Sequence, residues 1–203
     1  QPRIPLETFS KAVEAIYDCA LDPIRWQDTI AVIAELLQSQ RCALGVHDLA
    51  SGHNRLAFQL GYVEEYWRLH ESKYKSINPV WASIQLMPVK TVATNSMLID
   101  DQEFFESRFY QEWCKPQGLR DAIVLKVLQT EKRMGLLVAN RYPRYGDAEV
   151  RLMNLLSPHI CRAITISDVL DLKTIRSEAL EATLNALGSG VYLTDRHGRV
   201  VFM

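Results

Sequence analysis

The chain has 203 residues, of which 48% are hydrophobic and 23% are charged, so it can bury one large core and at most part of a second. Its 23 basic and 24 acidic side chains leave a formal net charge of −1. This balance excludes binding to nucleic acid through an excess of positive charge, because there is no such excess to face the phosphates.

The first part of the chain is predicted to form two helices. Apolar residues recur at helical spacing over residues 6–20, and the pattern stops before Pro23, which disfavours helical geometry in the residue that precedes it. Asp22 is expected to cap a second helix that has Pro23 at its first position. The apolar stripe of this second helix runs over residues 26–37.

Two short β-compatible runs follow, at residues 42–47 and 56–60. Residues 50–54 between them are rich in turn formers. This pattern predicts an antiparallel hairpin.

The next stretch is predicted to be helical. Residues 62–74 have helical spacing with aromatic side chains on more than one side, and Asn78-Pro79 predicts the start of a short helix over residues 79–86. Residues 88–92 are a candidate third strand. Asp100 and Glu103 have the spacing of a capping box.

One further helix is expected after this box, because Phe105, Phe109 and Trp113 are four residues apart, and Gly118 is expected to end it. Residues 122–128 and 134–140 are mostly β-branched or aliphatic and flank a polar tetrapeptide, which predicts a second hairpin.

Taken together, these elements predict an α+β fold with a central antiparallel sheet of about five strands flanked by helices, because the short connections within each pair require antiparallel strands.

The last long element is a predicted C-terminal helix over residues 147–187, in which Pro158 produces a kink or divides two helices in line. We expect residues 152–163 to fold back onto the sheet. Residues 166–187 carry an apolar stripe with charges elsewhere, which favours dimerisation with a second copy. After Gly188-Ser189-Gly190, residues 191–203 are predicted to be a hairpin.

Other features of the sequence bear on chemistry and location. The longest apolar runs are far shorter than the roughly 20 residues that cross a bilayer, and no secretory signal is visible, so we expect a cytoplasmic protein without a membrane partner. The four cysteines, Cys19, Cys42, Cys114 and Cys161, lack metal-binding spacing and are interpreted as reduced core thiols.

No catalytic motif, metal-ligand spacing or phosphate loop is present in the sequence, so we expect no enzyme activity, no metal and no cofactor. A hydrolase that uses Cys114 with a distant histidine is an alternative. The aromatic residues between positions 62 and 113 are interpreted either as the lining of a ligand pocket or as ordinary core packing.

Residues 62–67 (YVEEYW) and 74–80 (YKSINPV) resemble the autoinducer-binding region of LuxR-type transcription regulators. In that family, an aromatic helix of the form W-x-x-x-Y leads to a Y-x-x-x-D-P-V turn. With one residue deleted, Tyr66 takes the tryptophan place, His70 the tyrosine place and Asn78 the aspartate place. The later part of the chain also resembles such a sensor, including those of relatives with a GAF-like or PAS-like input domain. The resemblance lies in residues 109–119, the two strands that follow, Arg141 and a closing helix with residues 157–159.

The resemblance implies three segments: a sensory domain with a GAF/PAS-like sandwich over residues 1–165, a linker and dimerisation helix over 166–189, and the start of a PAS domain over 190–203. In proteins of this layout a PAS domain precedes a C-terminal helix-turn-helix, which this chain does not contain, so contact with DNA is expected only through that domain.

The resemblance also implies a pocket between the sheet and the aromatic helices. Two places differ from acyl-homoserine-lactone receptors: Asn78 stands where a carboxylate accepts the ligand amide, and Tyr66 stands where a tryptophan binds the lactone carbonyl. Because an amide also presents donors, we expect a different ligand, a small apolar or aromatic molecule. The candidate ligand-binding residues are Tyr62, Tyr66, Trp67, His70, Tyr74, Asn78, Trp81 and Trp113.

The function that follows is the sensing input of a LuxR-type regulator that forms a homodimer through its C-terminal helix. The alternative is a sensor module of a signalling enzyme, such as a histidine kinase or a cyclic-dinucleotide synthase, because sensor folds are shared between outputs.

Overall fold

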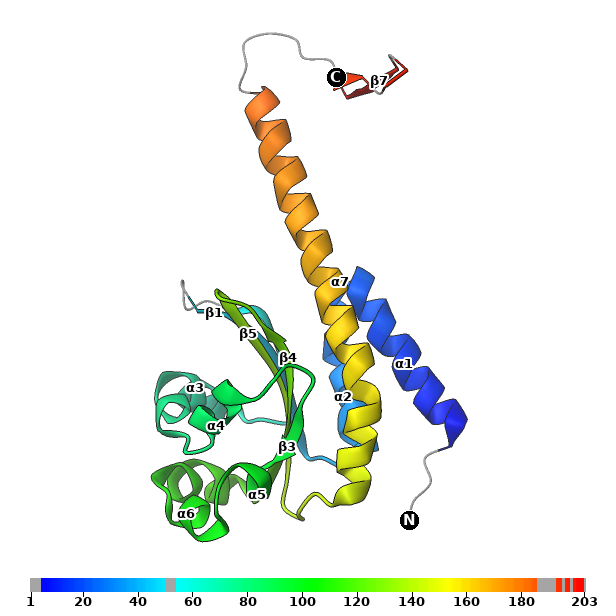
Figure 1. Ribbon diagram of the computed structural model, residues 1–203. Coiled ribbons are helices and arrows are strands. Elements are labelled where there is room, and N and C mark those ends of the chain that lie inside the picture. Colours follow the sequence, from blue (N-terminus) through cyan, green and yellow to red (C-terminus); the bar gives the residue numbers. More distant parts are fainter. Residues whose placement is uncertain (1–4, 50–53, 186–192, 195, 198, 203) are drawn as a thin grey trace.

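A computed structural model describes residues 5–49, 54–185, 193–194, 196–197 and 199–202 of the chain. Its centre is a five-stranded sheet in the order β2-β1-β5-β4-β3, and every neighbouring pair is antiparallel (Figure 1). The strands are β1 (Arg41–Asp48), β2 (Asn54–Leu60), β3 (Val92–Thr94), β4 (Asp121–Gln129) and β5 (Arg133–Arg141). The predicted α+β fold is thus confirmed, as are the hairpins predicted for residues 42–60 and 122–140.

Helices α2 (Trp26–Leu36) and the 39-residue α7 (Asp147–Asn185) pack on one face of this sheet, and α1 (Leu6–Leu21) packs on the outer side of both (Figure 1). Helix α2 follows a short 3₁₀ turn, η1 (Pro23–Arg25). The side chain of Asp22 makes no capping hydrogen bond and lies 3.6 Å from the Arg25 guanidinium instead, so the predicted cap is wrong.

The opposite face is covered by short and irregular helical segments (Figure 1). In chain order they are α3 (Glu64–Ser72), η2 (Tyr74–Ile77), α4 (Trp81–Leu86), α5 (Asn95–Leu98), α6 (Asp101–Glu106), the π-helical turn η3 (Tyr110–Cys114) and the 3₁₀ turn η4 (Lys115–Gln117). This layer places many aromatic side chains against the sheet.

The predicted single helix after residue 100 is divided in two. Asp100 caps α6 as expected, because its side chain accepts from the backbone amides of Gln102 and Glu103. Ser107 then leaves helical geometry, with ψ of 146°, and its hydroxyl accepts from the Tyr110 amide at 3.1 Å. A serine that caps a new turn competes with continuation of the helix. Gly118 ends the following segment in a left-handed conformation, as predicted.

The candidate third strand is also displaced. Residues 88–91 form a turn, closed by a hydrogen bond from the Thr91 amide to the Pro88 carbonyl, and Lys90 has a φ of 72°. The strand begins only at Val92, and its backbone pairs with β4 over residues 92–94.

Alternation along the central strands divides the buried residues into two groups. On β1, Cys42, Leu44 and Val46 belong to the core beneath α1, α2 and α7, whereas Ala43 packs with the residues of the opposite face. On β5, Leu137 and Ala139 face the long helices, whereas Leu136 and Val138 face the short ones. Side chains alternate because successive residues of a strand point to opposite faces.

Helix α7 is continuous through Pro158, so it is not divided into two helices. Its first half packs on the sheet as predicted, with Met153, Leu156 and Ile160 fully buried, and its second half extends away from the sheet (Figure 1). Among the described helices, none is long and apolar enough to cross a membrane. Strands β6 (Leu193–Thr194) and β7 (Val200–Phe202) pair antiparallel; residues 186–192 lie outside the described residues.

Candidate functional site

A cavity of about 120 Å³ lies between the sheet and the layer of short helices. Its sheet side includes four positions with little or no side chain, Ala43, Gly45, Ala57 and Ala122. Larger residues at these positions would fill the space, so the small side chains of the strands create the cavity. It lies where the sequence predicted a pocket, beside residues 62–81 and 105–113.

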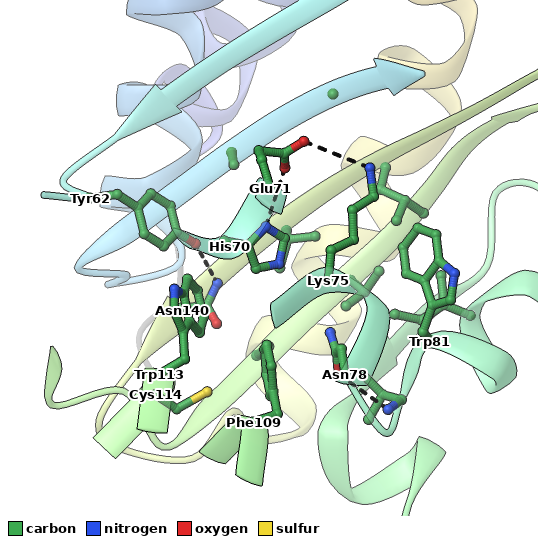
Figure 2. Close-up of a pocket in the computed structure, with 18 of the residues that line it drawn as sticks. Tyr62, His70, Glu71, Lys75, Asn78, Trp81, Phe109, Trp113, Cys114 and Asn140 are labelled. Atoms are coloured by element: carbon green, nitrogen blue, oxygen red, sulfur yellow. Dashed lines mark hydrogen bonds and ion pairs between the residues drawn. The ribbon is translucent and has the colours of Figure 1, made fainter. Parts of the chain in front are cut away.

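Aromatic rings form the wall opposite the sheet (Figure 2). The ring of Trp113 stacks on Phe109 at 5.2 Å between centroids and on Tyr62 at 6.0 Å. Its indole N–H donates to the Tyr66 carbonyl at 2.9 Å, which fixes the ring in one orientation. Trp67 and His70 stack at 6.1 Å on the same side. Such offset stacks give a rigid apolar surface that fits a flat ligand.

One end of the cavity carries a buried polar pair. The Asn140 side-chain amide donates to the Tyr62 hydroxyl at 2.7 Å, and both residues are at least nine-tenths buried. Burial raises the pKa of the Tyr62 phenol above its ordinary value of 10.0, so this group stays neutral and keeps its proton as a hydrogen-bond donor.

A cluster of four ionisable side chains lines another part of the cavity. The ammonium of Lys75 lies 3.3 Å from each ring nitrogen of His47 and 3.8 Å from Glu71 Oε2. The other oxygen of Glu71 lies 3.2 Å from Nδ1 of His70. This hydrogen bond is the largest cause that lowers the pKa of Glu71 from its ordinary value of 4.5. The cluster therefore places a lysine, a glutamate and two histidines at the edge of an aromatic wall.

Six of the eight candidate residues line the cavity: Tyr62, Trp67, His70, Asn78, Trp81 and Trp113. Asn78 also starts the next helical turn, since its side-chain oxygen accepts from the Val80 amide at 3.2 Å. Tyr66 and Tyr74 do not line the cavity. The Tyr74 hydroxyl donates instead to Glu112 at 3.2 Å, and Tyr66 receives the Trp113 indole through its backbone.

Five polar lining residues were missed: His47, Glu71, Lys75, Asn95 and Asn140. The signal for the first and the last was strand alternation, because His47 follows Ala43 and Gly45 at intervals of two and Asn140 follows Leu136 and Val138 in the same way. Glu71 and Lys75 have the i, i+4 spacing of a helical ion pair. Nothing in the sequence shows that this pair faces a cavity.

The cysteines are reduced and buried. Cys114 lines the cavity, but burial raises the pKa of its thiol above the ordinary value of 9.0, which leaves the weakly nucleophilic protonated form. Within the described part of the chain, no three His, Cys, Asp or Glu side chains gather in a way that suits a metal ion.

The fold is similar to that of GAF domains and of the ligand-binding domains of LuxR-type regulators. No protein-family model and no curated protein sequence matches the chain. The similarity is found among solved structures.

Three of these structures illustrate the similarity. The VqsR ligand-binding domain from Pseudomonas aeruginosa has a TM-score of 0.61 at 12% identity, covering 78% of this chain and 94% of that one. The N-acylhomoserine-lactone-dependent LuxR-family factor CepR2 from Burkholderia cenocepacia has a TM-score of 0.54 at 14% identity, and the match covers 76% of this chain and 92% of that one. The GAF domain of a phosphoenolpyruvate-protein phosphotransferase from Coxiella burnetii has a TM-score of 0.54 at 12% identity, and the match covers 82% of this chain and 98% of that one. At these identities the likeness shows a shared fold.

Proposed function

We propose that this region is the small-molecule-sensing input of a LuxR-type transcription regulator. The observation that carries the proposal is the aromatic cavity on the sheet face opposite α7. Cavities lined mostly by apolar and aromatic groups, with a few polar side chains, are typical ligand sites. A small apolar or aromatic ligand is the expected occupant. The region acts in the cytoplasm without catalysis of its own, and contact with DNA belongs to another domain.

Signalling requires that the ligand binds two conformations with different affinity. Two contacts connect the strands around the cavity to α7. Arg133, at the start of β5, forms a largely buried ion pair with Asp168 of α7, and β5 also supplies Leu136, Val138 and Asn140 to the cavity. The Ser157 hydroxyl of α7 donates to the Lys90 carbonyl, just before β3, at 3.0 Å. A shift of these strands upon binding would therefore change the position of α7.

A homodimer through residues 166–187 is part of the proposal. Ile166, Val169 and Leu170 are more than a third exposed, with Val169 at 46%, on the half of α7 that leaves the sheet (Figure 1). Pairing of this stripe with a second copy would bury these residues and bring the two ends of α7 together, as a two-fold output requires.

The test is to fill the cavity from the sheet side. Ala43→Leu adds three carbons to the cavity floor, whereas Ala82→Leu makes the same change at an exposed position of α4 that does not line the cavity. We expect small aromatic and apolar compounds to raise the melting temperature of the natural protein and of Ala82→Leu, but not of Ala43→Leu. Stabilisation by the same compounds in Ala43→Leu would contradict the cavity as their site.

Oligomeric state is measured on the same samples by native mass spectrometry, which also reveals any small molecule retained through purification. A monomer at micromolar concentration would remove the dimer from the proposal.

A second function has support from one comparison. The GAF domain of the phosphotransferase shows that a similar fold occurs in an enzyme, so the same cavity would suit the sensor module of a signalling enzyme. The full-length protein distinguishes the two: a helix-turn-helix domain elsewhere in it would support the regulator, and a catalytic domain would support the enzyme.

A further inference from the structure

The cavity is lined by one permanently charged cation. Among its described lining residues, Lys75 is the only lysine or arginine and Glu71 is the only acid. Every other polar side chain of the lining is an amide, a phenol, an indole, an imidazole or a thiol. The charge of Lys75 is therefore the feature that most strongly selects between ligands of different charge.

The ammonium of Lys75 has the capacity to bind an additional acceptor. It carries three N–H donors, and an imidazole such as that of His47 accepts through at most one nitrogen. The distance of 3.8 Å to Glu71 Oε2 is beyond hydrogen-bond range, and the His70 ring engages the other oxygen of Glu71. The Lys75 side chain is 27% exposed, so a ligand can approach it. Figure 2 shows Lys75 reaching toward Glu71 along the edge of the cavity.

The size of the cavity limits the uncharged part of the ligand. A cavity of about 150 Å³ in another protein binds benzene, and this cavity measures about 120 Å³. A single six-membered ring therefore matches the space, while a long acyl chain requires the walls to move apart.

The walls favour an aromatic ring over an aliphatic group of the same size. The lining includes Trp81, whose ring centroid lies 5.7 Å from the Lys75 ammonium, together with Phe109 and Trp113, which stack at 5.2 Å. A flat ligand can stack on these faces or meet their edges.

We propose that the cavity takes a single-ring aromatic carboxylate about the size of benzoate, with its carboxylate on Lys75 beside His47 and its ring against the aromatic wall. This inference rests on the proposed function, that the cavity binds a small molecule. An ammonium–carboxylate contact at the edge of an apolar site is a charge-assisted hydrogen bond, which is about twice as strong as a neutral one.

The test uses benzoate and its neutral analogue benzamide on the full chain, followed by tryptophan fluorescence and ligand-detected NMR. We expect benzoate to bind at least about tenfold more tightly than benzamide, and Lys75→Met to reduce benzoate affinity at least about tenfold while it leaves benzamide affinity within about twofold. Methionine keeps much of the length of the lysine side chain and removes its charged ammonium group.

The matched control is Lys73→Met. Lys73 is two residues away and contacts Glu112 and Tyr74, and it does not line the cavity. The same loss of charge at this position is expected to leave benzoate affinity unchanged. An equal loss in both variants would mean that general electrostatic attraction, rather than a contact with Lys75, holds the acid.

The Glu71→Gln variant is expected to change benzoate affinity in the opposite direction, because it removes the negative charge beside the proposed carboxylate. We expect benzoate affinity to rise by about threefold or more. This variant keeps Lys75 in place, so it remains informative if Lys75→Met does not fold.

The outcomes separate the two proposals. If benzamide binds as tightly as benzoate, and Lys75→Met changes neither affinity, the carboxylate inference is wrong while the sensing cavity stands. If neither compound binds and no other compound in the cavity-filling experiment distinguishes Ala43→Leu from Ala82→Leu, the proposed function itself fails.

Discussion

The two faces of the sheet differ in how they are covered. Beneath α1, α2 and α7, the core contains many completely buried side chains, including Trp26 and Ile30 of α2 and Leu44 of β1. On the other face, seven short segments replace three longer helices, small residues lie on the strands, and a cavity remains.

This difference indicates that the two faces of one domain have different roles. Close packing on the face beneath α2 and α7 supplies stability, because interior atoms gain both burial and contacts. The cavity face gives up part of that packing and keeps the space in which we propose that a ligand binds. Each of the following predictions tests that contrast with one pair of positions or one contact.

The largest effect is expected from two adjacent leucines of β5. Leu137 is fully buried toward the long helices and Leu136, at 8% exposure, lines the cavity. Leu137→Ala is expected to lower the free energy of unfolding by about 3–5 kcal/mol and Leu136→Ala by about 2 kcal/mol, because Leu136 already lacks neighbours on its cavity side. Urea unfolding of the two variants measures both values. Equal losses would contradict the contrast between the faces.

A smaller effect is expected from two glycines on opposite faces. A Cβ at Gly135 would lie 2.7 Å from Val127 Cγ2 and 3.2 Å from Val46 Cγ2, whereas a Cβ at Gly45 would lie 3.4 Å from the nearest atom, in the His47 ring. Gly135→Ala is expected to cost about 1–3 kcal/mol through overpacking.

Gly45→Ala is expected instead to leave stability unchanged or to raise it by at most about 0.5 kcal/mol, because alanine is less flexible in the unfolded chain. Thermal unfolding followed by circular dichroism ranks the two variants. A larger loss for Gly45→Ala would show that the cavity face is the more tightly packed of the two.

The smallest effect concerns the ion pairs that connect the short helices of the cavity face. Glu112 Oε1 accepts from Arg108 at 2.8 Å and Glu112 Oε2 accepts from Lys73 at 3.0 Å. The hydrogen bond from Arg108, followed by that from Lys73, lowers the pKa of Glu112 from 4.5 to about 2. The contribution of these ion pairs to the stability of the fold is therefore complete above pH 4.5 and is lost as the pH falls from 4.5 to about 2.

Glu112→Gln is expected to make stability depend less steeply on pH in that interval, with only a slight change at neutral pH because the pairs are at the surface. Urea midpoints between pH 2 and 5 measure this slope, and high salt should weaken the difference. An unchanged slope would show that other carboxylates dominate acid unfolding.

Much of the sheet could be predicted because its strands are short apolar runs flanked by turn residues. The hairpin of β4 and β5, for example, follows directly from the polar turn between residues 129 and 133. The helical layer over the cavity was harder to predict. Residues 101–118 have continuous helical spacing, and the break at Ser107 depends on a single hydroxyl that caps the next turn.

The candidate site was predicted in its aromatic part and missed in its charged part. Tyr62, Trp67 and Trp113 stand out in the sequence by their size and spacing. Lys75 and Glu71 are typical in sequence of a solvent-exposed ion pair, and only the packing of α3 and η2 on the sheet brings them to the cavity with His47.

The sequence by itself determined the order of helices and strands, the antiparallel sheet and the long terminal helix, because periodicity and turn residues act over neighbouring positions. Tertiary structure alone decided that the small residues of separate strands, Ala43, Gly45 and Ala122, share one floor and that Lys75 lies at its edge. The reason is that a cavity is a space between elements, and its shape depends on contacts between residues far apart in the chain.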